Sequence, residues 1–112
     1  MNIASEQHVA AIVIRLDGDL TVDDSDNFKR TIRESTNDFS SDIVVDCTSL
    51  SQIDSVGLES LLWLSDEARS NNYRLRLACV PQTVSNIFCL TRLDGAFSTH
   101  PSVEAAARSL NL

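Results

Sequence analysis

Asp46 to Leu64 reads DCTSLSQIDSVGLESLLWL, and the rest of the chain is organised around this stretch. The apolar residues 43–45 just before it predict a buried strand, and the polar residues that follow predict an exposed loop. Leucines then recur at helical spacing, so we expect a helix from about Ser55 to Asn71. The Asp54-Ser55 step therefore lies where a loop turns into a helix, and it is the candidate functional element.

The predicted helix has one apolar face and one polar face. Trp63 points away from the apolar face and lies among acidic side chains, so we expect it on the exposed side. The apolar positions follow the spacing i, i+3, i+4, i+7 and i+10, with Leu64 at the margin of the face. The residues of this face are Leu58, Leu61, Leu62, Ser65 and Ala68.

Strand and helix patterns alternate along the chain, which predicts an α/β fold with helices covering a sheet. Residues 9–16 are mostly apolar, as expected of a strand buried on both faces, and Asp17-Gly18-Asp19 predicts a turn after it. Arg74 to Val80 alternates, as expected of a strand with one exposed face. The remaining expected elements are strands at 3–6, 42–46 and 96–98, and helices at 22–35, at 81–91 and after Ser102 as N-cap. No repeat or linker is found, so we expect a single domain over residues 1–112.

The expected helix at 22–35 begins with an acidic cluster, Asp23, Asp24 and Asp26. These carboxylates complement the positive end of the helix dipole, and their spacing does not match a calcium-binding loop. We therefore expect no metal there. The apolar stripe of this helix consists of Val22, Phe28 and Ile32.

The formal net charge of -7 gives the molecule a field that repels phosphate backbones and anionic lipid headgroups. Nucleic acid and membrane surfaces are therefore not expected as partners. The longest apolar run is far too short to span a bilayer, and no secretion signal is recognised at the start. We expect a soluble, cytoplasmic protein.

Three cysteines are present, an odd number without a C-x-x-C pair. This argues against a disulfide framework and against a structural zinc site, and it favours a reducing compartment. We expect Cys47 and Cys79 to be small buried side chains. Cys89 lies opposite the apolar edge of the helix at 81–91, so we expect it to be exposed.

Enzymatic chemistry has little support in the sequence. Gly18, Gly57 and Gly95 are isolated, so neither a P-loop nor a dinucleotide-binding fingerprint can be assembled. A serine hydrolase needs a nucleophile elbow and a histidine base, whereas His8 and His100 have no motif around them. We expect no enzyme activity and no cofactor.

Two main interpretations of Ser55 remain when only the residues around it are considered. Asp54 or Ser55 can cap the helix by accepting a hydrogen bond from a free amide of its first turn, which contributes about 1 kcal/mol. Ser55 can instead be the substrate of a modifying partner. A role as a nucleophile is the weakest interpretation because no base accompanies it.

Three runs of the chain resemble the STAS domain of bacterial anti-sigma factor antagonists. They are VIRLDGDL at 13–20, VVDCTSLSQIDSVGL at 44–58 and VPQTVSNIFCLTRLD at 80–94. The resemblance covers nearly the whole chain. It implies the STAS fold, an α/β fold with a mixed sheet of about four to five strands and about four helices packed on one side.

The resemblance also implies a function. In that family the serine after the motif aspartate is phosphorylated by a partner that is both anti-sigma factor and serine kinase. Here that serine is Ser55, preceded by Asp54, and Val56 follows it where the family often has Ser or Thr, which leaves one candidate hydroxyl. ATP and Mg²⁺ would belong to the kinase, and a PP2C-type phosphatase would reverse the modification. The alternative is an unmodified STAS docking subunit of a membrane-transport or signalling complex.

The expected partner-binding surface surrounds Ser55 and extends along its helix. Trp63 is a candidate binding hot spot, because tryptophan is enriched at such positions; the alternative is that it packs flat under a neighbouring loop. Thr21 follows the Gly18-Asp19-Leu20 step, where the family often has an acidic residue. The residues expected in this surface are Thr21, Asp54, Ser55, Val56, Gly57, Leu58, Glu59 and Trp63.

Overall fold

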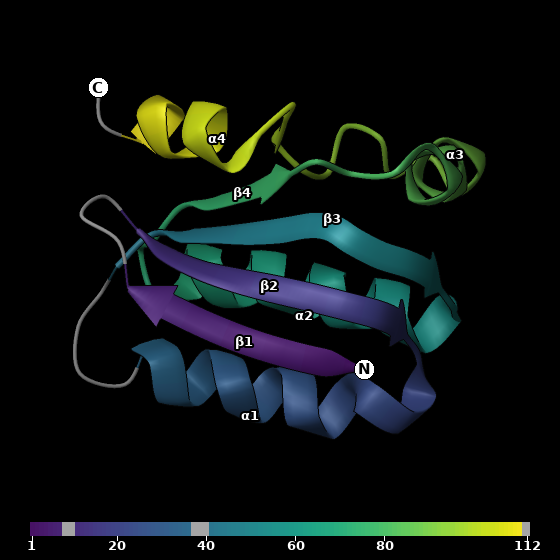
Figure 1. Cartoon of the computed structure of the whole chain (residues 1–112), viewed down its shortest axis with the longest axis horizontal. Helices are drawn as coiled ribbons and strands as arrows, with labels where there is room; N and C mark the ends of the chain where they lie inside the picture. The colour runs from purple at the N-terminus through teal and green to yellow at the C-terminus, as the bar shows by residue number, and fades with distance from the viewer. Residues whose placement is uncertain (8–10, 37–40, 111–112) are drawn as a thin grey trace.

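The computed structural model describes residues 1–7, 11–36 and 41–110. The elements follow in the order β1 (Asn2–Gln7), β2 (Ile12–Leu20), the 3-10 turn η1 (Val22–Asp24), α1 (Ser25–Thr36), β3 (Ile43–Ile53), α2 (Ser55–Ser70), β4 (Leu75–Ala78), α3 (Gln82–Leu90), β5 (Thr99–His100) and α4 (Val103–Leu110) (Figure 1). The predicted α/β class, with a mixed sheet of four or five strands and four helices, is confirmed.

The sheet has the strand order β1-β2-β3-β4-β5. β1 pairs antiparallel with β2, and the other three pairings are parallel. Parallel neighbours need a crossover connection, which α1, α2 and α3 supply in turn. At the centre of the sheet Ile14 is paired with Val45, and Val45 with Leu77, so the apolar middles of three strands lie side by side.

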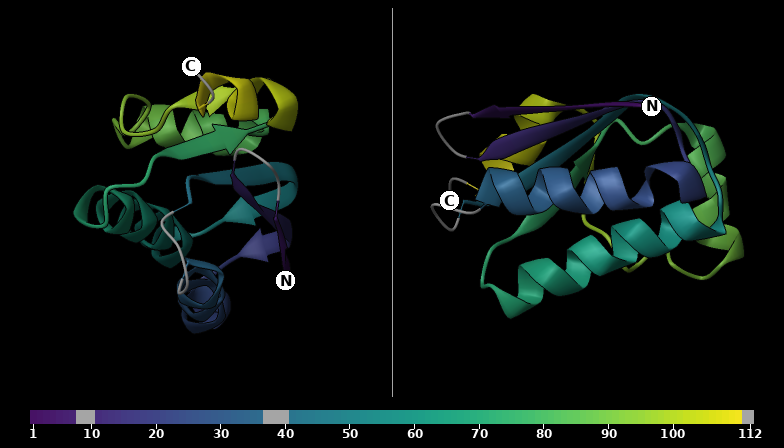
Figure 2. Two further views of the ribbon diagram at one scale, coloured as in Figure 1. Left: turned by 90° about the vertical axis from the view of Figure 1, so that its left-hand side faces the viewer. Right: turned by 90° about the horizontal axis from the view of Figure 1, so that it is seen from below.

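Helices cover both faces of the sheet. α1, α2 and α3 contribute to the larger core on one face, where Phe28, Leu61 and Phe88 are buried. α4 packs on the opposite face, where Ala106 and Leu110 contact a small core made with Val13, Val44 and Ala78. Figure 2 shows α1 and α2 on one side of the strands and α4 on the other.

The expectation that all the helices pack on one side is therefore wrong for α4. The strand predicted at 74–80 also has no exposed face at Ala78, because α4 lies over it. Burial on both faces, predicted for the strand at 9–16, is confirmed for Ile12 to Ile14. The two-sided burial of these strands is possible because α4 provides the second cover.

Two strands run further than their sequence patterns indicate. β2 continues through Asp17-Gly18-Asp19 to Leu20, and β3 continues beyond Asp46 to Ile53, so the predicted turn and the predicted loop are both wrong. The two extensions pair with each other, with Leu20 opposite Ile53 and register shifts on the way. Long-range pairing and burial of Leu20, Leu50 and Ile53 outweigh the polar character of the intervening residues.

Smaller differences concern single residues. Val22 lies in η1 and is 60% exposed, rather than in the buried stripe of α1. On α2, Leu64 is fully buried and Leu62 is only half-buried. The sequence pattern places Leu62 within the apolar face and Leu64 at its margin. The last strand is at Thr99–His100 rather than 96–98, because residues 94–97 turn.

Other local predictions hold. α2 begins at Ser55, and its C-cap is Asn71. Ser102 caps α4, with its Oγ accepting a hydrogen bond of 3.0 Å from the amide of Ala105. In the described part of the chain, none of the helices has the length and apolar character needed to cross a bilayer. His8 and the start of the strand predicted at 9–16 lie outside the described residues.

Candidate functional site at the start of α2

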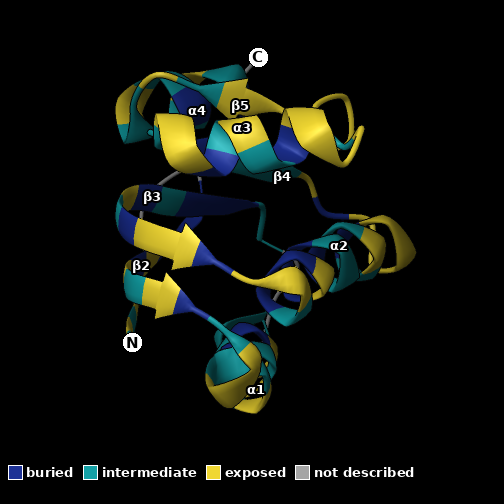
Figure 3. Ribbon diagram, turned by 90° about the vertical axis from the view of Figure 1, so that its right-hand side faces the viewer, coloured by how far each residue is buried: buried dark blue, intermediate teal, exposed yellow. Residues whose placement is uncertain are grey.

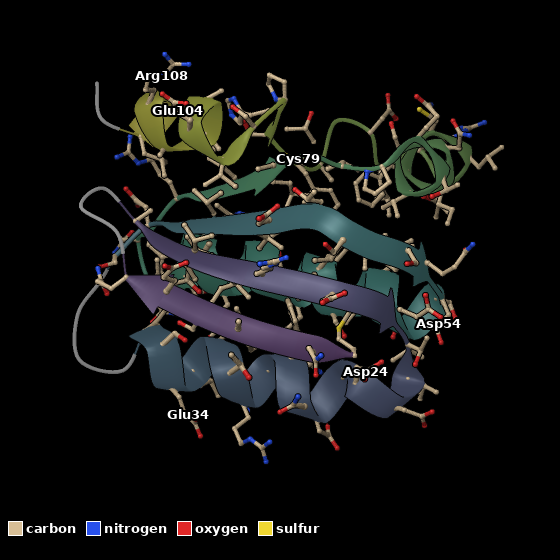
Figure 4. All side chains as sticks on the ribbon, viewed as in Figure 1. Asp24, Glu34, Asp54, Cys79, Glu104 and Arg108 are labelled. Atoms are coloured by element: carbon tan, nitrogen blue, oxygen red, sulfur yellow. The ribbon has the colours of Figure 1, made fainter. Side chains whose placement is uncertain are left out.

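The candidate site lies at the carboxyl end of the sheet, where β3 leads into α2 and β2 leads into η1. Figure 3 faces this end of the molecule, with the tips of β2 and β3 toward the viewer. Figure 4 labels Asp54 at the start of α2 and Asp24 at the start of α1. The long pairing of β2 with β3 brings these two segments together, since Leu20 and Ile53 are opposite each other.

Asp54 is the N-cap of α2. Its backbone is extended, and its Oδ1 accepts a hydrogen bond of 2.7 Å from the amide of Gly57. Its Oδ2 accepts one of 3.1 Å from the amide of Val22, which joins α2 to the η1 turn. Of the two cap candidates in the sequence, Asp54 is therefore the one that caps, and it also connects the two loops.

Gly57 brings the first turn of α2 against the end of β2. A Cβ added at this position would overlap the carbonyl oxygen of Leu20 and crowd the side chain of Ile53. Only glycine permits this approach without a shift of backbone. The amide of Asp54 also donates to the Leu20 carbonyl, at 3.3 Å. The start of α2 is thus positioned by backbone contacts.

The η1 turn has a cap of its own. The amide and the hydroxyl of Thr21 both donate to Oδ2 of Asp24, at 3.1 and 3.0 Å. The amino group of Met1 lies 3.7 Å from Oδ1 of the same carboxylate. Desolvation acts to raise the pKa of Asp24, but the hydrogen bonds from Thr21 and the Met1 charge outweigh it, and the pKa lies below 3.8. Asp24 is therefore a structural carboxylate.

Ser55 is the first residue of α2, and its side chain is exposed. Its hydroxyl makes no hydrogen bond with the residues that the structure describes, because Asp54 already provides the cap. Val56 beside it is half-buried. Ser55 is thus available to a partner without loss of any contact that holds the helix.

Sequence reasoning missed two residues of this region. Ser60 is buried, donates to the carbonyl of Val56 at 3.0 Å and contacts the hydroxyl of Ser25 at 3.2 Å, so it links α2 to the start of α1. Val22 projects beside Asp54 as one of two large apolar side chains exposed among the described residues. Thr21 and Asp24 at a spacing of three were a sequence signal for a cap that leaves Val22 outside α1.

Trp63 is half-buried rather than fully exposed, and it packs against the main core. Its ring faces α1, with Nζ of Lys29 at 5.6 Å and Cζ of Arg33 at 5.3 Å from the ring centroid. Both distances are within the range of cation–π attraction. Its neighbour is therefore a helix, not the loop considered from the sequence.

The structure brings part of the predicted surface together. Asp54 and Ser55 lie at the surface with the half-buried Thr21 and Val56, and Glu59 is exposed one turn further on. Gly57 and Leu58 are buried beneath them and support the surface from inside. Trp63 lies eight residues beyond Ser55, roughly 12 Å along the helix axis.

The cysteines have three different environments. Cys47 is buried, and desolvation together with the charges of Asp46 and Cys79 raises its pKa to about 12, so it is an inert core residue. Cys79 is partly exposed, in contrast to the prediction, and Cys89 is exposed as predicted. Within the described ranges, histidine, cysteine and carboxylate side chains form no group of three that could hold a metal ion.

Comparisons with known proteins agree with this architecture. The family model of the STAS domain matches residues 2–106. A Thermotoga maritima protein assigned as an anti-sigma factor antagonist has a TM-score of 0.88 and 14% sequence identity, with 98% of this chain and 95% of that chain covered. The anti-sigma factor antagonist SpoIIAA in its unphosphorylated form has a TM-score of 0.73 and 20% identity, with 96% of both chains covered.

A transporter shares the same fold. The murine anion transporter Solute Carrier 26 family member A9 matches with a TM-score of 0.74 and 18% identity, and the match covers 95% of this chain but only 18% of the transporter. At these identities the similarity to solved structures demonstrates the fold. Domains with this fold occur in at least two kinds of protein, anti-sigma factor antagonists and an anion transporter.

Proposed function

The chain belongs to the STAS domain family, and from this membership we propose that it is a bacterial anti-sigma factor antagonist switched by phosphorylation of Ser55. In its unphosphorylated state it binds an anti-sigma factor with serine kinase activity and so frees a sigma factor for transcription. Phosphorylation of Ser55 by that partner ends the binding. A PP2C-type phosphatase restores the first state.

One observation carries this proposal: the serine at the start of α2 is exposed and makes no bond within the described structure, while its neighbour Asp54 does the capping. A hydroxyl that capped the helix would lose its role on modification. Here a kinase can phosphorylate the Ser55 hydroxyl without disrupting the first turn of α2. Gly57, held against Leu20, keeps that turn in place during the reaction.

The switch acts through the interface and leaves the fold intact. Phosphorylation adds a charge of about -1.5 to -2, which the free amides at a helix start tolerate well. Beside Asp54 and inside a docked surface, the same charge repels acidic groups of the partner and lacks a matching donor. An unmatched buried charge costs about 3 kcal/mol, which weakens binding roughly a hundredfold.

The test is a kinase assay on matched variants. The protein is incubated with ATP, Mg²⁺ and a histidine-kinase-like ATPase encoded in the same genome, and the intact mass is measured. We expect one added phosphate on the native chain and on Ser51→Ala, which removes another exposed hydroxyl from the same region. Ser55→Ala should gain none but should still form the complex. Phosphate on a different residue, or none with any candidate kinase, overturns the proposal.

The partner surface is tested separately by binding. Ser55→Asp should reduce affinity for the unmodified partner, with an unchanged melting temperature. Trp63→Phe keeps an aromatic ring in contact with the core, so a loss of affinity in this variant without a loss of stability would support Trp63 as a partner contact. Equal affinity would restrict the surface to the region of Thr21, Asp54, Ser55 and Glu59.

The similarity to an anion transporter favours a second candidate, a docking subunit of a membrane-transport or signalling complex. In that case the start of α2 is a contact surface that is never modified. The two candidates differ in one result. Incubation with ATP and the partner kinase should add one phosphate at Ser55 to the antagonist and none to the docking subunit.

A further inference from the structure

A hollow of about 350 Å³ lies between α3 and the carboxyl ends of β4 and β5. This volume is within the range of small-molecule sites in proteins. None of the residues proposed to bind the anti-sigma factor contributes to it. Its walls are made by Cys79, Val80, Ser85, Phe88, Asp94, Thr99, His100 and Pro101.

The hollow is a crevice at the carboxyl ends of two adjacent parallel strands, β4 and β5. After β4 the chain turns to α3, whose apolar side joins the core on the face of α1 and α2. After the adjacent parallel strand β5 it turns to α4 on the opposite face. The chain therefore leaves these two neighbouring strands toward opposite faces of the sheet. Figure 1 shows α3 beyond the end of β4 at the upper right and α4 above β4 at the upper left.

The backbone at this crevice is held in an uncommon conformation. Cys79, which follows β4 directly and is labelled in Figure 4, has a φ of +58°. Its amide donates to the carbonyl of His100 at 3.0 Å, and its thiol contacts the carbonyl of Pro101 at 3.4 Å. Non-glycine residues adopt a positive φ rarely and at a cost. The two bonds to the β5 side hold this wall in a preformed shape.

The polar groups of the lining are available to a ligand. The hydroxyls of Ser85 and Thr99 and the carboxylate of Asp94 make no hydrogen bond within the described ranges. His100 places Nε2 3.2 Å from Oγ of Ser98, and its other ring nitrogen has no partner in the described structure. Val80 and Pro101 add apolar surface. The lining thus combines hydrogen-bonding groups with apolar side chains.

We propose that this crevice binds a small, uncharged or cationic heteroaromatic amine. Asp94 carries the negative charge of the lining and accepts the hydrogen bonds of the amino group. Ser85 and His100 bond to ring nitrogens, and the ring packs on Val80 and Pro101. Anions are disfavoured because they meet a carboxylate in a chain of net charge -7.

The experiment is an NMR titration of the full ¹⁵N-labelled chain with 2-aminobenzimidazole, paired with indole-2-carboxylate as an anion of similar ring size. We expect saturable shifts of the Cys79, Ser85 and His100 amides by the amine, with a Kd of about 1 mM or lower. The Ser55 amide should not move. Asp94→Asn should weaken binding roughly tenfold, as expected for one lost charge-assisted hydrogen bond.

Asp26→Asn is the matched control, since Asp26 is an exposed carboxylate on α1 without a hydrogen bond in the described structure. It changes the net charge by the same amount and should leave the affinity unchanged. Shifts that do not saturate, or that fall outside the crevice, overturn the proposal. Equal affinity of Asp94→Asn, or binding of the carboxylate as tight as that of the amine, overturns the assigned ligand class.

Discussion

At its first turn α2 meets β2 through backbone atoms and η1 through the Asp54 carboxylate, whereas in its middle it meets α1 through the Trp63 ring and two long cationic side chains. Gly57 leaves no space before the Leu20 carbonyl, and Asp54 bonds to two amides. Lys29 and Arg33 only lie over an aromatic face. The close backbone approach at Gly57 and the two bonds of the Asp54 carboxylate define the position of Ser55, while the middle of the helix contacts α1 through long side chains. Substitutions in the two regions should therefore differ in their cost to stability.

Gly57→Ala should have the largest effect. The added methyl overlaps the backbone oxygen of Leu20, and neither the strand nor the helix can yield without losing other contacts. We expect a loss of about 3 kcal/mol in the free energy of unfolding, measured by urea denaturation. Gly95→Ala is the control, because a Cβ there meets nothing within 4 Å, and its cost should stay below about 0.5 kcal/mol. Similar losses in both variants would mean that the close approach is unimportant.

Asp54→Ala should come next. It removes the cap of α2 and the bond to the Val22 amide, and we expect a loss of about 1 to 2 kcal/mol in urea denaturation. Asp54→Asn keeps an acceptor and should retain most of that stability. Ser55→Ala should cost less than about 0.5 kcal/mol, since its hydroxyl is unbonded in the described structure. If Ser55→Ala is the more damaging variant, the cap has been assigned to the wrong residue.

Arg33→Gln tests the middle of α2. Loss of one cation over the Trp63 ring should reduce stability by about 0.5 to 1 kcal/mol. Since Trp63 is the sole tryptophan, its fluorescence reports this contact directly, and we expect the emission to shift toward longer wavelength. Arg108→Gln, an exposed arginine on α4, removes the same charge without changing the emission. An unchanged emission spectrum for Arg33→Gln would mean that the Arg33 guanidinium does not contact the Trp63 ring.

The Asp24 carboxylate should produce a small, pH-dependent effect at the η1 turn. Its pKa in the folded chain is below 3.8, so the ionised form stabilises the fold above that pH. This contribution is lost as the pH falls through the folded pKa. Thermal unfolding followed from pH 6 to pH 3 should show a shallower decline for Asp24→Asn than for the native chain. Parallel curves for the two proteins would mean that the ionised Asp24 carboxylate does not accept the hydrogen bonds of Thr21.

Local signals in the sequence were reliable where neighbouring residues alone decide the structure. The start of α2 at Ser55, its end at Asn71 and the cap at Ser102 follow from periodicity and cap residues, and all three are confirmed. The extension of β3 to Ile53 could not be recognised in this way. Its polar residues become a strand because β2, far away in the sequence, pairs with them.

The position of α4 was also decided by tertiary contacts. The mostly apolar run at 9–16 indicated a strand buried on both faces, but no local pattern identified which helix supplies the second cover. Ala106 and Leu110 of α4 supply this cover, because the chain passes from β5 to that face of the sheet. The hollow beside Cys79 lies where the chain passes from α3 on one face to α4 on the other.

The alternation of strands and helices, the helix that begins at Ser55 and the likeness to STAS domains could be recognised from the residues alone, since periodicity, cap residues and motif spacing are local properties. That the Asp54 carboxylate also binds the amide of Val22, 32 positions away, depends on tertiary contacts that no local pattern contains. The tertiary structure also decided that Trp63 faces α1 and that Gly57 meets Leu20. These contacts depend on the pairing of β2 with β3, which brings distant segments together.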